Sequence, residues 1–270
     1  MIPYYHTEHG KLFNGDCIEV MKQLEDNSID CCVTSPPYDN LRNYKGFSFD
    51  FENTAKELYR IIKKGGIVVW VVADATINGS ETGTSFKQAL YFKEIGFNLH
   101  DTMIYQKNGF PFPSNNRYYQ CFEYMFILSK GKPKTVNLLS DRPNLTYGRK
   151  DSISSNRQKD GSCKKTKSIS IKENGVRYNI WKYEVGWGKS YKEDFLRSHP
   201  AIFPYKLAED HILSWSNEND IILDPFCGSG TMAVMAEKLN RKWIGIEISK
   251  EYCEIIKKRL SLNEPALPLK

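Results

Sequence analysis

A glycine-rich segment in the last quarter of the chain combines residue types that suit a bound nucleoside. It reads Asp224-Pro225-Phe226-Cys227-Gly228-Ser229-Gly230-Thr231 and lies between a predicted strand and a predicted helix. Glycines let the backbone approach a ligand closely, and a helix N-terminus offers free N–H groups. Glu247 follows Gly228 by nineteen residues, a spacing that suits an acid binding ribose hydroxyls. The same glycines also match a dinucleotide-binding fingerprint, so an NAD-dependent oxidoreductase is the alternative.

A second motif, Thr34-Ser35-Pro36-Pro37-Tyr38, ends a predicted buried strand in the first half of the chain. Two consecutive prolines remove two N–H donors and hold the backbone extended, which leaves carbonyl oxygens as acceptors. Together with the hydroxyl and the aromatic ring, they suit a planar heterocycle that carries an exocyclic amino group. Hydride transfer to a nicotinamide has no use for such a set. The pair of motifs therefore favours a nucleoside cofactor without phosphates.

In this order, the two motifs resemble those of the DNA amino-methyltransferases that use S-adenosylmethionine. Ser35-Pro36-Pro37-Tyr38 resembles their catalytic tetrapeptide, and the segment 224–231 resembles their cofactor loop. The catalytic motif comes first and a variable region separates the two, which resembles the circularly permuted β group of that family. The resemblance implies S-adenosyl-L-methionine as cofactor, double-stranded DNA as partner and no metal.

The resemblance also assigns roles to further residues. Asn14-Gly15-Asp16-Cys17 resembles the motif whose Asp contacts the adenine amino group, and the segment 199–204 resembles the one that lines the methionine end. The implied cofactor-binding residues are Asp16, Cys17, Phe203, Asp224, Pro225, Phe226, Gly228, Ser229, Gly230, Thr231 and Glu247. The implied catalytic residues are Ser35, Pro36, Pro37 and Tyr38.

The implied reaction is methyl transfer to an amino nitrogen of a base that is flipped out of the duplex. Acceptors at Ser35 and Pro36 would localise the nitrogen lone pair and stabilise the charge that develops on it. In this family Ser in the first position is usual for cytosine-N4 enzymes, and Asp or Asn for adenine-N6 enzymes, so Ser35 favours cytosine. Adenine-N6 is the alternative, because a hydroxyl accepts from either amino group. An RNA or protein-glutamine methyltransferase and an inactive DNA-binding module are two further candidates.

The charge distribution indicates where DNA would bind. The 270-residue chain has a formal net charge of +6. Between Lys132 and Leu196, fifteen Lys and Arg residues stand against seven Asp and Glu, with Tyr and Trp interleaved. Contact with phosphates and bases uses both residue types. We expect this segment to be the target-recognition region, with DNA contacts at Arg149, Arg157, Lys164, Lys165, Lys167 and Arg177.

The elements that must position these motifs follow from the alternation of strand-like and helix-like stretches. It predicts an α/β fold with a Rossmann-like, mostly parallel sheet and helices on both faces. Residues 29–34 and 67–73 are predicted strands, and 51–63 a helix closed by Gly65-Gly66. We expect a catalytic and cofactor-binding domain over 1–131 and 197–263, a loop-rich target-recognition insertion over 132–196, and a C-terminal tail over 264–270.

Several classes are excluded or disfavoured by composition. Seven cysteines without a Cys-x-x-Cys pair and five scattered histidines argue against a disulfide framework and a metal site. The longest apolar run, 67–73, is far shorter than the about 20 residues of a membrane span. The start of the chain lacks a secretory signal pattern. We expect a cytoplasmic, nucleoid-associated protein of prokaryotic or phage type. A cognate restriction endonuclease, the recognised site and the oligomeric state are left open.

Overall fold

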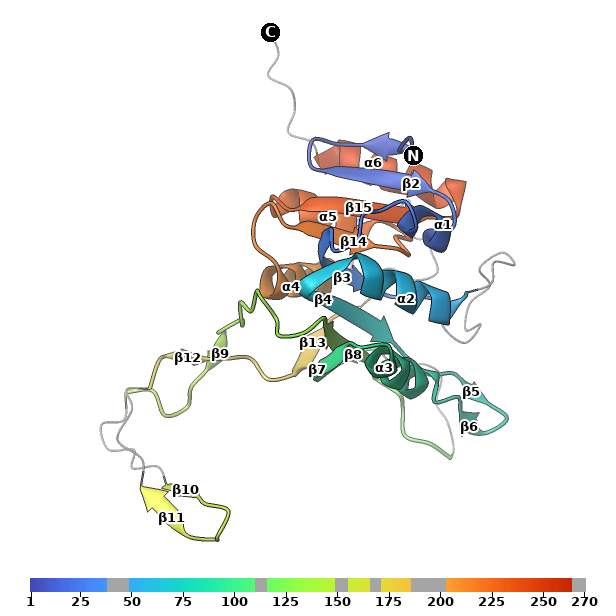
Figure 1. The fold of residues 1–270 in the computed structure, drawn as a ribbon. Helices are drawn as coiled ribbons and strands as arrows, with labels where there is room; N and C mark the ends of the chain where they lie inside the picture. The colour runs from blue at the N-terminus through green and yellow to red at the C-terminus, as the bar shows by residue number, and fades with distance from the viewer. Residues whose placement is uncertain (38–48, 110–115, 149–154, 166–170, 186–202, 264–270) are drawn as a thin grey trace. The chain divides into compact units, whose positions relative to one another are not determined.

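The computed structural model describes residues 1–37, 49–109, 116–148, 155–165, 171–185 and 203–263. The chain divides into two compact units, one formed by Met1–Asn137 with Asn179–Lys270 and the other by Leu138–Tyr178. The first unit is built on a nine-stranded sheet (Figure 1). Its strands in spatial order are β1 (Tyr5–His6), β2 (Gly10–Asn14), β15 (Lys242–Glu247), β14 (Ile221–Asp224), β3 (Ile29–Thr34), β4 (Ile62–Val72), β8 (Phe122–Ser129), β7 (Asn98–Lys107) and β13 (Ile180–Tyr183).

The middle of this sheet is parallel. Strands β2, β15, β14, β3 and β4 pair parallel to one another, whereas β1 and β8 join their neighbours antiparallel. The chain leads from β3 to β4 on one side and from β14 to β15 on the other, so the strand order reverses between β14 and β3. Open α/β sheets bind ligands at the carboxyl ends of the strands beside such a switch point. The predicted mostly parallel α/β sheet is confirmed.

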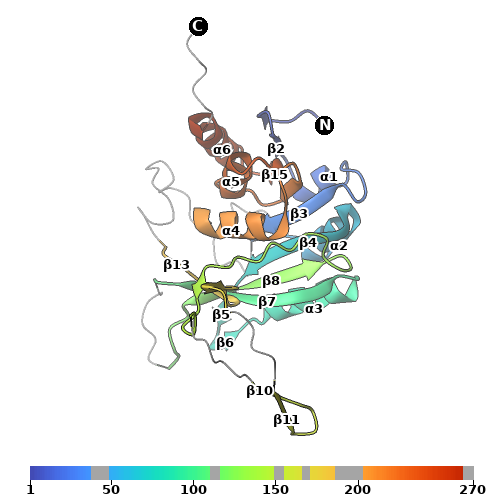
Figure 2. The same cartoon turned by 90° about the vertical axis from the view of Figure 1, so that its left-hand side faces the viewer.

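Helices cover both faces of the sheet (Figure 2). One face carries α1 (Cys17–Met21), α2 (Phe51–Ile61) and α3 (Thr84–Glu94), and the other carries α4 (Tyr205–Trp215), α5 (Thr231–Lys238) and α6 (Lys250–Asn263). The helix α2 covers the sheet with one apolar face, because Ala55, Leu58 and Ile61 recur at helical spacing and are completely buried. That face packs into a core with Trp70 of β4.

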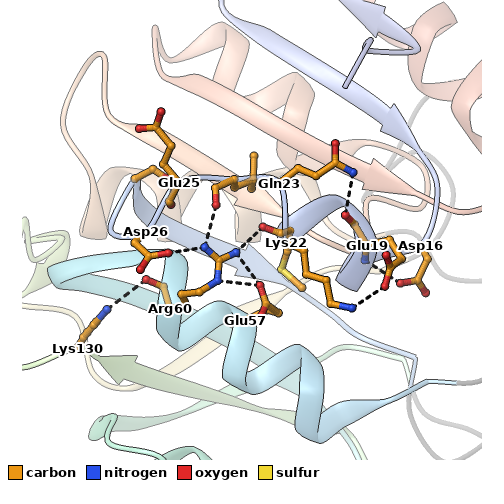
Figure 3. Close-up of polar contacts among 12 residues, drawn as sticks. Asp16, Glu19, Lys22, Gln23, Glu25, Asp26, Glu57, Arg60 and Lys130 are labelled. Carbon is orange, nitrogen blue, oxygen red and sulfur yellow. Dashed lines mark hydrogen bonds and ion pairs between the residues drawn. The ribbon is translucent and has the colours of Figure 1, made fainter.

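A charged cluster fixes the end of α2 against the loop that follows α1 (Figure 3). The guanidinium of Arg60 donates to the carbonyls of Met21 and Leu24 at 2.7 and 2.9 Å. It also pairs with Asp26 at 2.6 Å and with Glu57 at 2.7 Å. One side chain thus binds the last carbonyl of α1 and a carbonyl of the turn that follows it.

The predicted helix 51–63 is wrong at its end. The strand β4 begins at Ile62, directly after α2, and both glycines lie inside it. Pairing with β3 explains this start, because Ile62 lies opposite Ile29 and the Ser28 N–H donates to the Ile61 carbonyl at 2.8 Å. A Cβ atom on Gly66 would lie 2.7 Å from the Asp30 carbonyl oxygen. The glycine therefore permits a close approach between two strands rather than ending a helix.

The second unit contains two short antiparallel pairs. Strand β9 (Arg142–Pro143) pairs with β12 (Asn174–Gly175), and β10 (Ser155–Arg157) pairs with β11 (Cys163–Lys165). The insertion expected over 132–196 is therefore too broad, because β13 lies within it and pairs parallel with β7 of the large sheet. Side chains along β13 alternate between exposed and buried, the pattern of a strand with one face against the core.

Candidate active site at the switch point of the sheet

The catalytic motif begins where β3 ends. Thr34 is the last residue of the strand, and Ser35, Pro36 and Pro37 follow it at the carboxyl edge. Pro36 is buried, whereas Ser35 and Pro37 are half-buried. Tyr38 lies outside the described residues. The strand therefore brings the hydroxyl and the proline carbonyls to the edge at which a parallel sheet binds ligands.

Asp224 ends the neighbouring strand β14, on the other side of the switch point. Its Oδ1 accepts a hydrogen bond from Thr34 Oγ1 at 2.6 Å and one from the Phe226 N–H at 3.1 Å. Burial raises the pKa of the Asp224 carboxyl to about 6, although the two hydrogen bonds act in the opposite direction. Residues 190 positions apart in the chain are thus joined directly between the catalytic and cofactor motifs.

The cofactor loop folds over the end of β15. The Cys227 N–H donates to the Ile246 carbonyl at 2.9 Å, and the Gly230 N–H donates to the Cys227 carbonyl at 2.7 Å. Gly228 and Gly230 have φ angles of 52° and 80°, which residues other than glycine rarely adopt. A Cβ atom on Gly230 would also lie 2.8 Å from Ile256 Cγ1. Glycine is therefore needed at 230 both for the backbone conformation and for packing against α6.

Arg259 supports this loop from α6. It is fully buried, donates to the Ser229 carbonyl, and donates to Thr231 Oγ1 at 3.2 Å. Its guanidinium also lies 4.9 Å from the centre of the Tyr205 ring, two residues after Phe203. The sequence pattern does not single out Arg259, because a basic residue in an amphipathic C-terminal helix is ordinarily exposed.

Glu247 ends β15 and faces the cofactor loop. Its Oε2 accepts from the Gly228 N–H and its Oε1 from the Ser249 N–H, each at 2.8 Å. Burial raises the pKa of the Glu247 carboxyl to about 7, while these two hydrogen bonds act in the opposite direction. A carboxylate oxygen has capacity for a second hydrogen bond. The side chain can therefore hold the loop and still accept from hydroxyl groups of a ligand.

Asp16 and Cys17 follow β2, the next strand along the edge. The last residue of β2, Asn14, lies opposite Glu247, and the Gly15 N–H donates to the Glu247 carbonyl at 3.1 Å. Asp16 is exposed and caps α1, accepting from the Ile18 and Glu19 N–H groups through Oδ1. Burial raises the pKa of the Cys17 thiol to about 11, so this residue is a neutral packing group at physiological pH.

The remaining predicted cofactor residues have mainly packing contacts. The Phe226 ring lies 5.2 Å from that of Phe49 and 6.4 Å from that of Trp70, measured between ring centres. Pro225, Ser229 and Thr231 are buried, and Phe203 is half-buried just before α4. These side chains therefore pack within the fold close to the carboxyl edge of the sheet.

The carboxylates at the edge indicate what kind of ligand fits. Asp16, Glu247 and Asp224 follow or end three adjacent parallel strands. Such a set accepts hydrogen bonds from hydroxyl and amino groups and attracts positive charge, and it repels phosphates. This set of acceptors therefore fits a cationic nucleoside and disfavours a dinucleotide with its pyrophosphate.

Another strand-end carboxylate belongs to the fold. Asp74, after β4, accepts from the N–H of Ser85 at 2.8 Å and from its hydroxyl at 2.5 Å, which holds the first turn of α3.

In the described part of the chain no group of three or more His, Cys, Asp and Glu side chains could hold a metal ion. Among the same residues no helix is long and apolar enough to cross a membrane.

The predicted DNA contacts fall in the second unit. Arg157 lies in β10 and Lys164 in β11, and both side chains are exposed. Lys165 is the last residue of β11. Arg177 forms an ion pair with Asp141, donating through Nε at 3.0 Å and also through Nη2. Arg149 and Lys167 lie outside the described residues.

Comparisons with known proteins place the chain in a family. The sequence model of a family described as DNA methylase (N6_N4_Mtase) matches residues 29–258. The orphan methyltransferase M.BamHII of Bacillus amyloliquefaciens is 62% identical over 241 residues, which are 88% of this chain and 91% of the relative. The family match covers both motifs in one continuous stretch.

Solved structures share the fold. The cytosine-N4-specific PvuII DNA methyltransferase superposes with a TM-score of 0.70 at 20% identity, covering 99% of this chain and 90% of that protein. A complex of M1.HpyAVI with SAM superposes with a TM-score of 0.58 at 26% identity, covering 93% and 99%. The two motifs, the strand order that brings them together and the match over most of the chain lead to one conclusion: this protein belongs to the N6/N4 family of DNA methylases.

Proposed function

We propose that this DNA amino-methyltransferase transfers the methyl group of S-adenosyl-L-methionine to the N4 amino group of cytosine in duplex DNA. The observation that carries the choice of base is the hydroxyl of Ser35, directly after β3 and beside the Asp224 strand end. The cytosine-N4 specificity named for the PvuII enzyme, which has the same fold, supports it. Adenine N6 is the second candidate, because a hydroxyl also accepts from that amino group.

The proposed cofactor matches the chemistry of the edge. S-adenosyl-L-methionine supplies an electrophilic methyl group on a positively charged sulfur when it is bound. We assign the ribose hydroxyls to Glu247, the adenine amino group to Asp16, and the methionine end to the segment that includes Phe203. The carboxylates favour a cation, and the M1.HpyAVI structure holds SAM in a related protein. The family assignment leaves the NAD-dependent alternative without support.

Ser35 and Pro36 would carry the chemistry. The exocyclic nitrogen is a poor nucleophile because its lone pair is delocalised into the ring. Ser35 Oγ and the Pro36 carbonyl would accept hydrogen bonds from the amino group, which localises the lone pair and stabilises the positive charge that develops. Tyr38 would stack on the flipped base and offset part of the unstacking free energy. No protein nucleophile is needed in this scheme.

We place DNA on the second unit, through Arg157, Lys164 and Lys165 together with Arg149 and Lys167. We assign Arg177 a structural role within that unit, because its Nε donates to both carboxylate oxygens of Asp141. The relative M.BamHII is named an orphan methyltransferase, which favours a solitary enzyme over one paired with a cognate restriction endonuclease. From a DNA substrate we infer a cytoplasmic location, since bacterial DNA lies there.

The test is product analysis with a labelled methyl donor. The purified protein is incubated with tritiated S-adenosyl-L-methionine and with plasmid DNA, total RNA or protein extract in parallel. The DNA is then digested to nucleosides and separated. We expect the label in N4-methylcytosine. Label in N6-methyladenine would overturn the base assignment, and label in RNA or protein without DNA would overturn the substrate.

A further inference from the structure

The catalytic and cofactor motifs are joined by one buried hydrogen bond that no role accounts for. Thr34 Oγ1 donates to Asp224 Oδ1 at 2.6 Å, and the two residues are 2% and 6% exposed. Resting on the proposed function, we infer that Thr34 is a positioning residue, whose hydroxyl fixes the catalytic Ser35-Pro36 segment relative to the cofactor loop.

The register of the sheet explains why a side chain is needed here. In the ladder between β3 and β14, Cys31 pairs with Ile222 and Cys32 with Leu223, so the pairing stops well before Ser35. After it β3 leads into the prolines and β14 into the glycine loop. The Thr34–Asp224 bond extends the connection between the strands to the point where the reacting groups must meet.

The same carboxylate oxygen also organises the cofactor loop. Asp224 Oδ1 accepts from the Phe226 N–H at 3.1 Å, so Thr34 and the first turn of the loop share one acceptor. A shift of β3 would therefore move the loop, and a shift of the loop would move Ser35. Methyl transfer requires in-line geometry, and a misplacement of about 1 Å costs on the order of 100-fold in rate. The hydrogen bond at this position therefore helps to align Ser35 with the cofactor loop.

The test compares Thr34→Val, which removes the hydroxyl and keeps the shape, with Thr34→Ser, which keeps the hydroxyl. We expect Thr34→Val to lower kcat for methyl transfer to DNA between about 10-fold and 100-fold. The Kd for S-adenosyl-L-methionine and the KM for DNA should stay within about threefold of wild type, and Thr34→Ser should restore most of kcat. If Thr34→Val does not fold, Thr34→Ala against Thr34→Ser isolates the hydroxyl.

Ser129→Ala is the matched control. Its hydroxyl is also buried and donates to a carbonyl at 2.8 Å, but it lies at the opposite edge of the sheet, where Ser129 pairs with Ile67. We expect a similar loss of stability without loss of kcat. Equal kcat in the valine (or alanine) and serine variants of Thr34, or an equal loss in Ser129→Ala, would overturn the positioning role.

A second readout separates this inference from the proposed function. The label in DNA is counted whichever base carries it, so an adenine product overturns only the base assignment. Hydrogen exchange is measured at the amides of the cofactor loop, 226–230, and needs no activity. Thr34→Val should speed exchange there and Thr34→Ser should not. Unchanged exchange in Thr34→Val would overturn the inference even if the wild-type protein were inactive on DNA.

Discussion

Two carboxyl groups of the site, those of Asp224 and Glu247, lie in surroundings that favour their neutral forms. Burial raises the pKa from 3.8 to about 6 for Asp224 and from 4.5 to about 7 for Glu247. The folded pKa therefore exceeds that of the unfolded chain in both cases. Their contribution to folding stability is complete at acidic pH and is lost as the pH rises through the folded values. Both carboxyl groups therefore favour folding less at neutral pH than at acidic pH.

Cofactor binding should consequently depend on pH through Glu247. Ribose hydroxyls donate to the ionised carboxylate, so the affinity for S-adenosyl-L-methionine is expected to rise as the pH increases through about 7. Binding at pH 7 should release a proton, which calorimetry in two buffers of different ionisation enthalpy detects. Glu247→Gln should bind more weakly and without this proton release. Affinity that is constant across this range in the wild type would contradict the assignment.

Ser35→Ala tests the catalytic motif. The hydroxyl acts chiefly on charge that develops in the transition state, so we expect kcat to fall by about 100-fold with little change in DNA binding. Single-turnover kinetics and a DNA-binding titration measure the two effects separately. Ser80→Ala, in the exposed hairpin of β5 (Thr76–Ile77) and β6 (Ser80–Glu81), is the control. A raised KM with unchanged kcat would rule out the proposed role of Ser35.

At the scale of elements, the predicted boundaries agree best with the structure where the local residue pattern and the pairing with other strands indicate the same boundary. The strand Ile29–Thr34 is predicted to the residue, because a short apolar run is bounded by turn-forming residues on both sides. The end of α2 and the strand β13 are not predicted in this way, because both depend on pairing with strands that are distant in the sequence. The Thr34–Asp224 hydrogen bond cannot be predicted from the sequence either, because no local residue pattern determines which threonine contacts which carboxylate.

The N-terminal glycines of two helices allow a matched comparison. Gly230 precedes α5 and Gly83 precedes α3, both with positive φ, but only at Gly230 would a Cβ atom clash, with Ile256. Alanine at either position should cost about 1–2 kcal/mol for the backbone conformation. We expect Gly230→Ala to lose more stability and also affinity for S-adenosyl-L-methionine. Thermal melting and calorimetry check both, and equal behaviour of the two variants would contradict the packing argument.

The cluster in Figure 3 should be a stability determinant. Arg60→Met removes hydrogen bonds to the carbonyls of Met21 and Leu24 and leaves Glu57 without this partner, so we expect a loss of about 2–3 kcal/mol in the free energy of unfolding. Lys22→Ala breaks only the exposed pair with Glu19 and should leave the free energy of unfolding almost unchanged. Denaturant melts of both variants distinguish a structural cluster from a solvated one.

At the scale of the whole molecule, the two units differ in charge. In Leu138–Tyr178 ten Lys and Arg residues stand against four Asp and Glu, so the second unit carries the whole formal charge of +6 and the first unit is neutral. This distribution supports the proposed placement of DNA on the second unit. Composition reveals this division, but it does not reveal where the large sheet ends. Trp181 and Tyr183 are buried in β13 although their neighbours in sequence resemble the insertion.

Replacing Lys164, Lys165 and Lys167 with alanine tests the second unit. We expect weaker binding to every duplex and a shallower dependence of log K on log salt, by up to about 0.9 for each phosphate that is no longer neutralised. The methylated sequence should be unchanged, since phosphate contacts carry no sequence information. Alanines at Lys250, Lys257 and Lys258 of α6 are the control. An unaltered salt dependence would place DNA elsewhere on the protein.

The position of β14 and β15 in the sheet has a consequence for synthesis of the protein. These two strands, formed by residues 221–247, separate β2 from β3, although β2 and β3 are made first. A nascent chain that has not yet released residues 221–247 therefore lacks the central strands against which β2 and β3 must pair. Pairing across such sequence separations is slow. Each newly translated molecule therefore completes this part of the sheet only after residues 221–247 have left the ribosome.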